Sequence, residues 1–201
     1  MFQLNIIIMK TNKLKIIIVS IIAIVGLNAS AQKCGVYKTY EDYSNGKMEV
    51  SIDCANKDGK IKPHDFFKTD YITVIKNGEK IDLKKDEIFG YQFCNGDMFR
   101  FLNNNRLTLV DKSGLWIFSK EVVVSHSPFT GTKKVTNYYF SKDGNSEIES
   151  LTFSNLKDAL PDNKALFSEM ELLFSSNSAL YVYNQSTGTF KINSFLNSKG
   201  L

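Results

Sequence analysis

The stretch that decides the fold is YITVIKNGEKIDL, which covers residues 71–83. Aromatic and β-branched residues precede Asn77-Gly78, and apolar and polar residues alternate after it. Both central residues of a type I′ turn need a positive φ, and the pair Asn-Gly adopts it at low cost. The stretch therefore predicts a two-residue β-hairpin.

Similar turns recur along the chain and separate further strand-like runs. These runs cover residues 48–54, 87–94, 98–102, 106–111 and 115–124, and a last hairpin joins 135–140 to 147–152. Most connectors have two to four residues and force antiparallel neighbours, because a parallel crossover needs a dozen or more. The predicted fold class is mainly β (α+β), an antiparallel β-meander of about eight strands. Eight strands can close into a barrel-like sheet, and an open sheet covered by helices fits the pattern equally well.

One short helix is predicted near the start of the domain. Tyr37, Tyr40 and Tyr43 lie three residues apart before Asn45-Gly46, which is typical of such a helix. Residues 56–62 have the composition of a polar loop.

The part from about residue 154 to 201 predicts two or three short helices. Ser154 is a suitable N-cap for a helix that ends before Pro161, and Asp162 for a second one. The expected buried stripe of that second helix has helical spacing and consists of Leu166, Met170, Leu173 and Phe174. Residues 180–183 suggest one more strand, and the apolar tail over 190–196 is expected to dock on the core.

Residues 1–31 have the order of a secretory signal peptide. Three lysines precede an apolar run over residues 16–27, and Ala29-Ser30-Ala31 follows. Twelve helical residues span only about 18 Å, short of the roughly 30 Å of a hydrocarbon core. We expect cleavage between Ala31 and Gln32, which leaves residues 32–201 as a single β-rich domain without a membrane span, exported to the periplasm or the medium.

Composition and charge exclude several classes of protein. Hydrophobic residues make up 43% of the 201 residues and charged residues 23%, an ordinary globular balance. The signal segment holds three of the 25 basic side chains and none of the 21 acidic ones, so the rest of the chain is almost neutral. Nucleic-acid binding is therefore not expected, because it depends on clustered Lys and Arg. No cofactor motif is present.

Export places the cysteines where disulfides persist. Cys54 ends an alternating run and Cys94 abuts an Asn-Gly turn, so we expect these two to pair, with Cys34 in a mobile N-terminal tail. A Cys–His nucleophile or a metal site would need His64 or His126, and their spacing fits neither.

Arg100 is the candidate ligand-binding residue. On a strand it shares a face with Met98 and Leu102, so its guanidinium stands among apolar neighbours and must be paired. One interpretation is a structural salt bridge to Glu87 or Asp111, and the other is an anchor for the carboxylate of a small ligand.

Four segments together resemble small exported proteins of the Bacteroidetes type, a family of unknown function. They are Asn28–Gln32, Gly35–Tyr43, Ile88–Tyr91 and Phe99–Phe101, and the match covers roughly residues 29–118. The resemblance implies export, and it brings no catalytic residues to transfer.

The expected function is that of a binding or interaction module of the cell envelope, with a small molecule or an envelope protein as partner. A hydrolase of envelope or extracellular polymers is one alternative, although Gly-x-Ser-x-Gly and Cys-x-x-Cys are absent and an enzyme is not favoured. A structural accessory subunit of a surface complex is the other. A binding module predicts a lined cavity, a hydrolase predicts a histidine beside a carboxylate or thiol, and a subunit predicts one large apolar patch.

Overall fold

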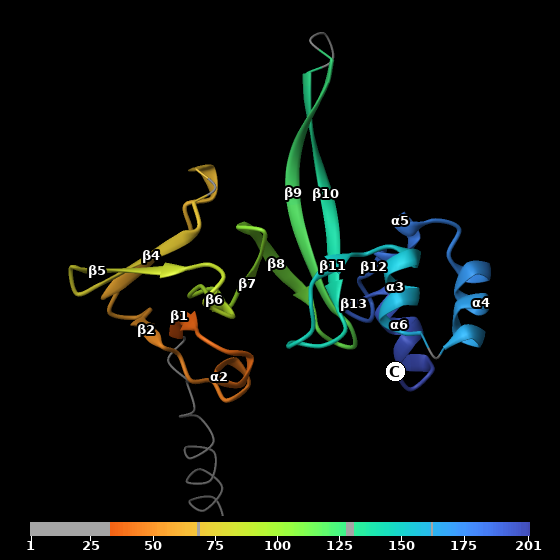
Figure 1. The fold of residues 1–201 in the computed structure, drawn as a ribbon, viewed down its shortest axis with the longest axis horizontal. Coiled ribbons are helices and arrows are strands. Elements are labelled where there is room, and N and C mark those ends of the chain that lie inside the picture. Colours follow the sequence, from red (N-terminus) through yellow and green to blue (C-terminus); the bar gives the residue numbers. More distant parts are fainter. Residues whose placement is uncertain (1–32, 68, 128–130, 162) are drawn as a thin grey trace, which may run out of the picture. The chain divides into compact units, whose positions relative to one another are not determined.

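The computed structural model describes residues 33–67, 69–127, 131–161 and 163–201, which form β-sheets followed by short helices (Figure 1). Sheet A has eight antiparallel strands in the order β11-β10-β9-β8-β7-β6-β1-β2. Its strands are β1 (Lys33–Tyr37), β2 (Val50–Asp53), β6 (Gly90–Gln92), β7 (Met98–Leu102), β8 (Asn105–Asp111), β9 (Trp116–Ser127), β10 (Gly131–Ser141) and β11 (Glu149–Ser150). The mainly β prediction is confirmed. Because the strand order ends at β11 and β2, the sheet is open rather than closed into a barrel.

The predicted hairpin is confirmed as β4 (Tyr71–Lys76) and β5 (Glu79–Lys84), with φ of 50° at Asn77 and 85° at Gly78. It does not belong to the meander, because it pairs with β3 (Gly59–Lys62) in the separate three-stranded sheet B. The predicted polar loop over residues 56–62 is therefore partly wrong. Ile61 is buried opposite Val74, and this burial holds β3 in the sheet.

The meander runs without interruption from β6 to β11, as predicted. Strand β1 was not predicted. It lies between β2 and β6, which are far apart in the sequence. Gly35 permits this insertion, since a Cβ atom there would overlap the carbonyl oxygen of Val50. Strands β9 and β10 are longer than predicted and continue as a two-stranded ribbon beyond their pairings with β8 and β11 (Figure 1).

The short helices cover parts of the sheets. They are α2 (Tyr40–Ser44), α3 (Phe153–Ala159), α4 (Lys164–Leu173), α5 (Asn177–Leu180) and α6 (Lys191–Ser198), with a 3-10 turn η1 (Asp65–Phe67) and the two-stranded sheet C of β12 (Tyr183–Asn184) and β13 (Thr189–Phe190). The helix predicted from the tyrosines is α2, although Tyr37 itself ends β1. Thr39 caps α2, because its hydroxyl accepts a hydrogen bond from the backbone N–H of Asp42 at 3.0 Å.

The C-terminal helices differ in detail from the prediction. Thr152, not Ser154, caps α3, and Asp162 lies outside the described residues. In α4 the buried positions include Phe167, whereas Leu173 is 54% exposed. The strand predicted over residues 180–183 is only partly found, because Leu180 ends α5 and Tyr183 begins the two-residue strand β12. The tail docks as expected, with Phe190, Ile192 and Leu196 buried.

Three apolar clusters hold these elements together. On one face of sheet A, residues near β2 and β6 pack against sheet B; this first cluster includes Cys34, Val36, Ile52, Ile72, Val74, Tyr91 and Phe99. Farther along, residues of β9 and β10 pack against the C-terminal helices; this second cluster includes Ile117, Phe140, Leu156, Met170, Ile192 and Leu196. The third cluster is aromatic and surrounds α2; it includes Tyr37, Phe89, Leu107, Trp116 and Phe118, with Tyr40 and Tyr43.

Candidate functional site

A polar stripe crosses sheet A between the first and second apolar clusters. Thr108 of β8 pairs with Phe99 on one side and with Ser119 of β9 on the other. Paired residues point to the same face, and side chains alternate along each strand. Arg106 and Glu121, two residues from Thr108 and Ser119, therefore lie on the face that also carries Phe99 and Ile117.

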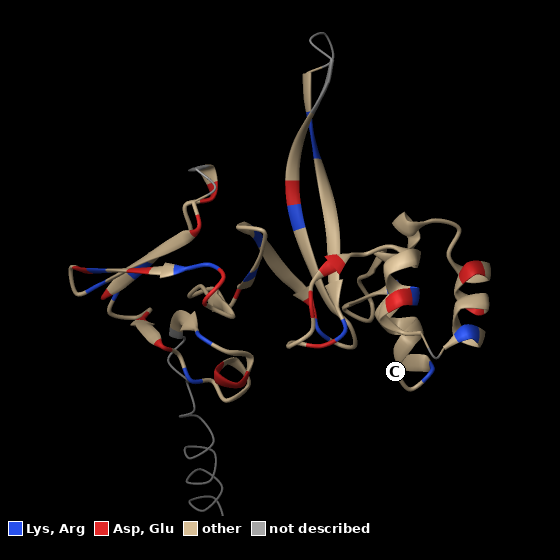
Figure 2. Cartoon of the chain, in the orientation of Figure 1, with Lys and Arg blue, Asp and Glu red and all other residues tan. Residues whose placement is uncertain are grey.

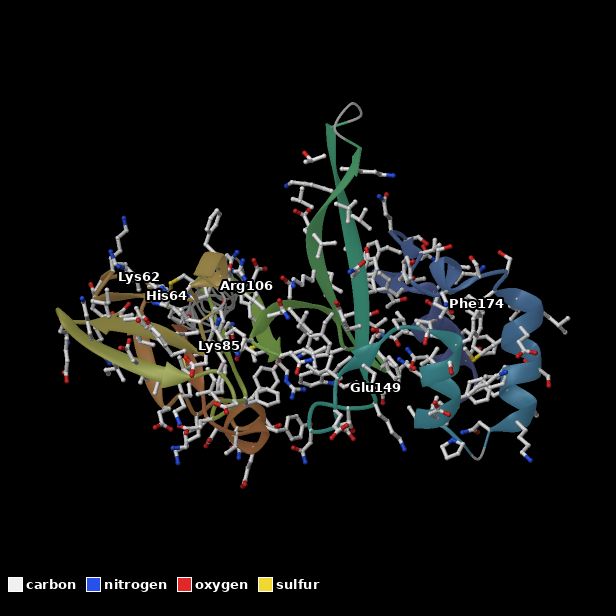
Figure 3. All side chains as sticks on the ribbon, turned by 45° about the horizontal axis from the view of Figure 1, so that its top comes forward. Lys62, His64, Lys85, Arg106, Glu149 and Phe174 are labelled. Carbon is white, nitrogen blue, oxygen red and sulfur yellow. A yellow bond between two sulfur atoms is a disulfide. The ribbon has the colours of Figure 1, made fainter. Side chains whose placement is uncertain are left out.

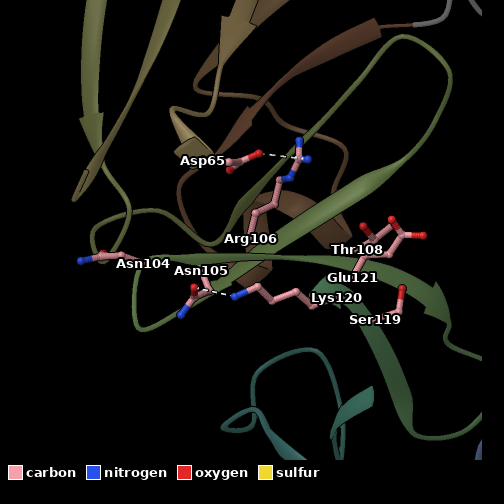
Figure 4. A pocket seen from close by; sticks show the side chains of 8 residues that line it. All are labelled: Asp65, Asn104, Asn105, Arg106, Thr108, Ser119, Lys120 and Glu121. Carbon is pink, nitrogen blue, oxygen red and sulfur yellow. Dashed lines mark hydrogen bonds and ion pairs between the residues drawn. The ribbon is translucent and has the colours of Figure 1, made fainter. Parts of the chain in front are cut away.

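The stripe forms the floor of a pocket of about 370 Å³ (Figure 4). Its lining is polar and comes from the turn between β7 and β8, from β8 and β9, and from η1. The residues are Asp65, Asn104, Asn105, Arg106, Thr108, Ser119, Lys120 and Glu121. Ligand pockets usually have volumes of roughly 300–1,000 Å³, so the space fits one small molecule.

Arg106 is the most constrained side chain of this pocket. Its Nη2 lies 2.9 Å from Oδ2 of Asp65, and its Nη1 donates to the Tyr91 hydroxyl at 3.4 Å. The guanidinium also lies 4.9 Å from the centre of the Phe99 ring. Burial raises the pKa of Tyr91, which therefore stays protonated. These contacts fix the direction of the guanidinium before any ligand binds.

A buried lysine supports the rim of the pocket. Lys85 is only 2% exposed, and its Nζ donates to the backbone carbonyl of Asn104 at 3.3 Å and lies 5.1 Å from the centre of the Phe101 ring. Burial lowers the pKa of this ammonium group, and the nearby carboxylate of Asp65 opposes the shift. Figure 3 shows Lys85 and Arg106 in the same region of the molecule.

The turn that Lys85 holds has a defined geometry. Asn103 and Asn104 are the two residues between β7 and β8, and their φ values are 49° and 62°. Asparagine tolerates this conformation better than most residues, and two such positions make a type I′ hairpin. In the next residue, the side-chain oxygen of Asn105 accepts a hydrogen bond from Lys120 Nζ at 2.6 Å (Figure 4).

On the face of the stripe, Arg106 is cationic and Asp65 and Glu121 are anionic, while hydroxyls supply further polar groups. Lys120 lies next to Ser119 on β9 and therefore points to the other face, where it binds Asn105. Figure 2 shows the two signs interspersed over the strands and helices of the described residues. The site therefore offers directional hydrogen bonds, with no excess of positive charge to attract a strongly anionic ligand.

The predicted candidate Arg100 lies elsewhere. It pairs with Leu107, on the face opposite to Arg106, where its Nη1 donates to the carbonyl of Gly144 at 3.1 Å and its guanidinium lies 4.5 Å from the centre of the Phe89 ring. Its Nε is buried and has no hydrogen-bond partner within the described part of the chain. Burial lowers the pKa of Arg100, and Asp143 opposes this.

Neither salt-bridge partner predicted for Arg100 contacts it. Glu87 pairs with Lys84 at 2.9 Å, and Asp111 accepts from the backbone N–H of Phe190 at 3.0 Å. The salt-bridge interpretation is therefore wrong, because aromatic rings and a backbone carbonyl surround the guanidinium instead. Arg100 does not line the polar pocket either.

The cysteines are placed as follows. Cys54 and Cys94 form a disulfide, the pair that the sequence favours, with their Cα atoms 5.6 Å apart. Cys34 is a free thiol and only 4% exposed in β1, so the mobile tail expected for it is wrong. Ala31 and Gln32 lie outside the described residues.

Of the two histidines, His64 contacts Thr73 and Tyr71. Nε2 of His64 lies 2.9 Å from the hydroxyl of Thr73, which itself donates to Asp82 at 2.6 Å. This chain of contacts fastens the loop before η1 to sheet B. The side chain of His126 lies outside the described part of the structure.

Sequence reasoning did not single out the pocket residues. The available signal was a pair of polar residues, Arg106 and Thr108, alternating with Leu107 and Leu109 in a strand. Alternation alone indicates a solvent-facing side, and only the register with β7 and β9 shows that this side lies between two covered parts of the sheet.

Comparisons with known proteins do not assign the chain to a family. A scan against protein-family models, a search of curated proteins and a search of solved structures each gave no significant match. Among the described residues, no helix has both the length and the apolar character needed to cross a membrane.

Proposed function

We propose that the protein is an exported binding module of the cell envelope, and that its polar pocket holds a small, hydroxyl-rich ligand such as a sugar. The supporting observation is the stripe on β8 and β9, where polar side chains interrupt an otherwise apolar face of sheet A. On a sheet face that is packed on both sides, a polar gap gives up apolar packing that the rest of the face makes, and a binding role explains this loss.

The lining favours this ligand class. A sugar hydroxyl both donates and accepts, and the pocket supplies acceptors on Asp65 and Glu121, donors on Arg106, and groups of both kinds on Thr108 and Ser119. One cation beside two carboxylates does not favour a phosphate or a polyanion. The fixed position of Arg106 lowers the conformational entropy lost on binding.

The hydrolase alternative has less support from the same residues. A glycosidase needs one carboxyl group free to donate a proton and a second carboxylate facing it. Asp65 is engaged by Arg106 at 2.9 Å, and Glu121 by Lys134 at 3.1 Å. Each carboxylate is thus held by a cation, an arrangement suited to orienting a ligand.

The test is a titration of the isotope-labelled protein with glucose, galactose, N-acetylglucosamine and glucuronate, followed by amide NMR. We expect at least one sugar to shift the resonances of residues 104–108 and 119–121 saturably. In Thr108→Val, which keeps the shape and removes one hydroxyl, the dissociation constant should rise about 2- to 10-fold, the equivalent of one hydrogen bond of about 0.5–1.5 kcal/mol.

Thr132→Val is the matched control, because Thr132 is exposed on β10 and does not line the pocket. It should bind like the wild type. If none of the four sugars shifts these resonances, or if both variants bind equally, the sugar proposal is refuted. Cleavage of the corresponding glycosides would instead favour the hydrolase.

A further inference from the structure

Three sulfur atoms gather at one end of sheet A. The Sγ atoms of Cys34, Cys54 and Cys94 all lie within 4.8 Å of one another, although only Cys54 and Cys94 are bonded. Cys34 is buried, whereas the other two lie nearer the surface. A free thiol thus stands beside a disulfide, which is the arrangement that thiol–disulfide exchange requires.

The strand order explains why the three sulfurs meet. Cys54 follows the last residue of β2, and Cys94 lies two residues beyond the end of β6. Because β1 lies between these strands, the disulfide joins its two neighbours across its first residues. Cys34 is the second residue of β1 and therefore lies next to this bridge.

We propose that the cluster is a thiol–disulfide exchange site: the Cys34 thiolate attacks Sγ of Cys54, and Cys94 leaves as a thiolate that reacts with the disulfide of another molecule. The first step forms the Cys34–Cys54 bond and breaks the Cys54–Cys94 bond, so it needs no oxidant or reductant. Solvent takes the proton from Cys34. In the second step Cys94 forms a mixed disulfide, and the other half of the partner's disulfide leaves as its thiolate.

The register favours Cys54 as the sulfur attacked. Cys34 pairs with Ile52, and Cys54 lies two residues farther along, on the same face and at the diagonal position. Cys94 is followed by the exposed turn Asn95-Gly96. Water can hydrate a thiolate there, and a better hydrated thiolate leaves more readily.

The environment of Cys34 slows the first step of the exchange. Burial raises the pKa of the Cys34 thiol, and the negative charge of Asp58 adds to this. Few Cys34 thiolates are present at neutral pH, so the attack on Cys54 is slow. The partner class is a disulfide-bearing small molecule or protein, and the inference does not depend on the proposed sugar pocket.

The test treats the folded protein with an excess of dithionitrobenzoate, an aromatic disulfide, followed by acid quenching and mapping of the disulfide-linked peptides by mass spectrometry. We expect release of one equivalent of thionitrobenzoate per chain, a second thionitrobenzoate in mixed disulfide with Cys94, and a Cys34–Cys54 bond. Cys34→Ala is the control. It should keep the Cys54–Cys94 bond and release no thionitrobenzoate.

Other labelling patterns overturn the proposal. A thionitrobenzoate group on Cys34 beside an intact Cys54–Cys94 bond shows direct reaction of the buried thiol, and a group on Cys54 shows attack on the wrong sulfur. Release only after unfolding in urea shows that the cluster is inert.

A second variant tests the geometry without relying on the control. Cys94→Ala, refolded with oxidised glutathione, should form a Cys34–Cys54 bond and carry no free thiol. Two free or glutathionylated thiols in that folded variant would refute the alternative pairing.

Discussion

Removal of the Cys54–Cys94 disulfide should destabilise the protein more than the other changes predicted below. The bond between Cys54 and Cys94 closes a loop with a sequence separation of 40 residues. In the chain-entropy model such a cross-link lowers the entropy of the unfolded state by about 13 cal/mol/K, which corresponds to about 4 kcal/mol at 25 °C. The double variant Cys54→Ala/Cys94→Ala should lose this amount of unfolding free energy.

Urea denaturation followed by circular dichroism measures this loss. With an m-value of about 2 kcal/mol/M, the midpoint should fall by about 2 M. The same double change in a chain that also carries Cys34→Ala separates the cross-link from any effect of the free thiol. A loss below about 1 kcal/mol would refute the reasoning, because it would mean that the unfolded chain is not constrained by this bond.

Two further changes test the packing. Gly144→Ala would place a Cβ atom in overlap with the Tyr40 ring and 2.8 Å from Cζ2 of Trp116, so we expect a loss of about 1–3 kcal/mol in thermal unfolding, whereas Asn145→Ala next to it should have little effect. Lys85→Met removes a buried ammonium group whose pKa is lowered on folding. At pH 7 the variant should therefore be more stable than the wild type. In the wild type the unfolded state binds more protons than the folded state, so the wild type gains stability as the pH rises through the lowered pKa towards 10.5. The stability advantage of the variant should therefore shrink between pH 7 and pH 10 in urea melts. An equal advantage at both pH values would contradict this assignment.

The hairpins were predictable because their turns are local. Asn77-Gly78 and the turn after Leu102 both adopt positive φ, and this preference depends on the residues themselves. Each such turn then fixes the pairing of its two strands. The sequence did not indicate that the strong hairpin of β4 and β5 leaves the meander and joins β3, because the choice of sheet depends on which apolar faces meet.

The two arginines show the limit of sequence reasoning about the site. Arg100 and Arg106 both stand in strands with apolar neighbours, and the sequence favoured Arg100. The register of β7 and β8 pairs Arg100 with Leu107 and Arg106 with Phe101, so the two guanidinium groups point to opposite faces. One face is closed by the aromatic cluster around α2, and the other contains the polar pocket.

By itself, the amino-acid sequence determined the mainly β fold class, the turns and the amphipathic C-terminal part, because backbone preferences and the spacing of apolar residues are set within a few neighbouring residues. Only the tertiary structure decided that β1 enters between β2 and β6, that three cysteines meet there, and that the polar residues of β8 and β9 face a gap between two covered regions. These features depend on pairings between residues far apart in the chain, and such pairings leave no local pattern to read.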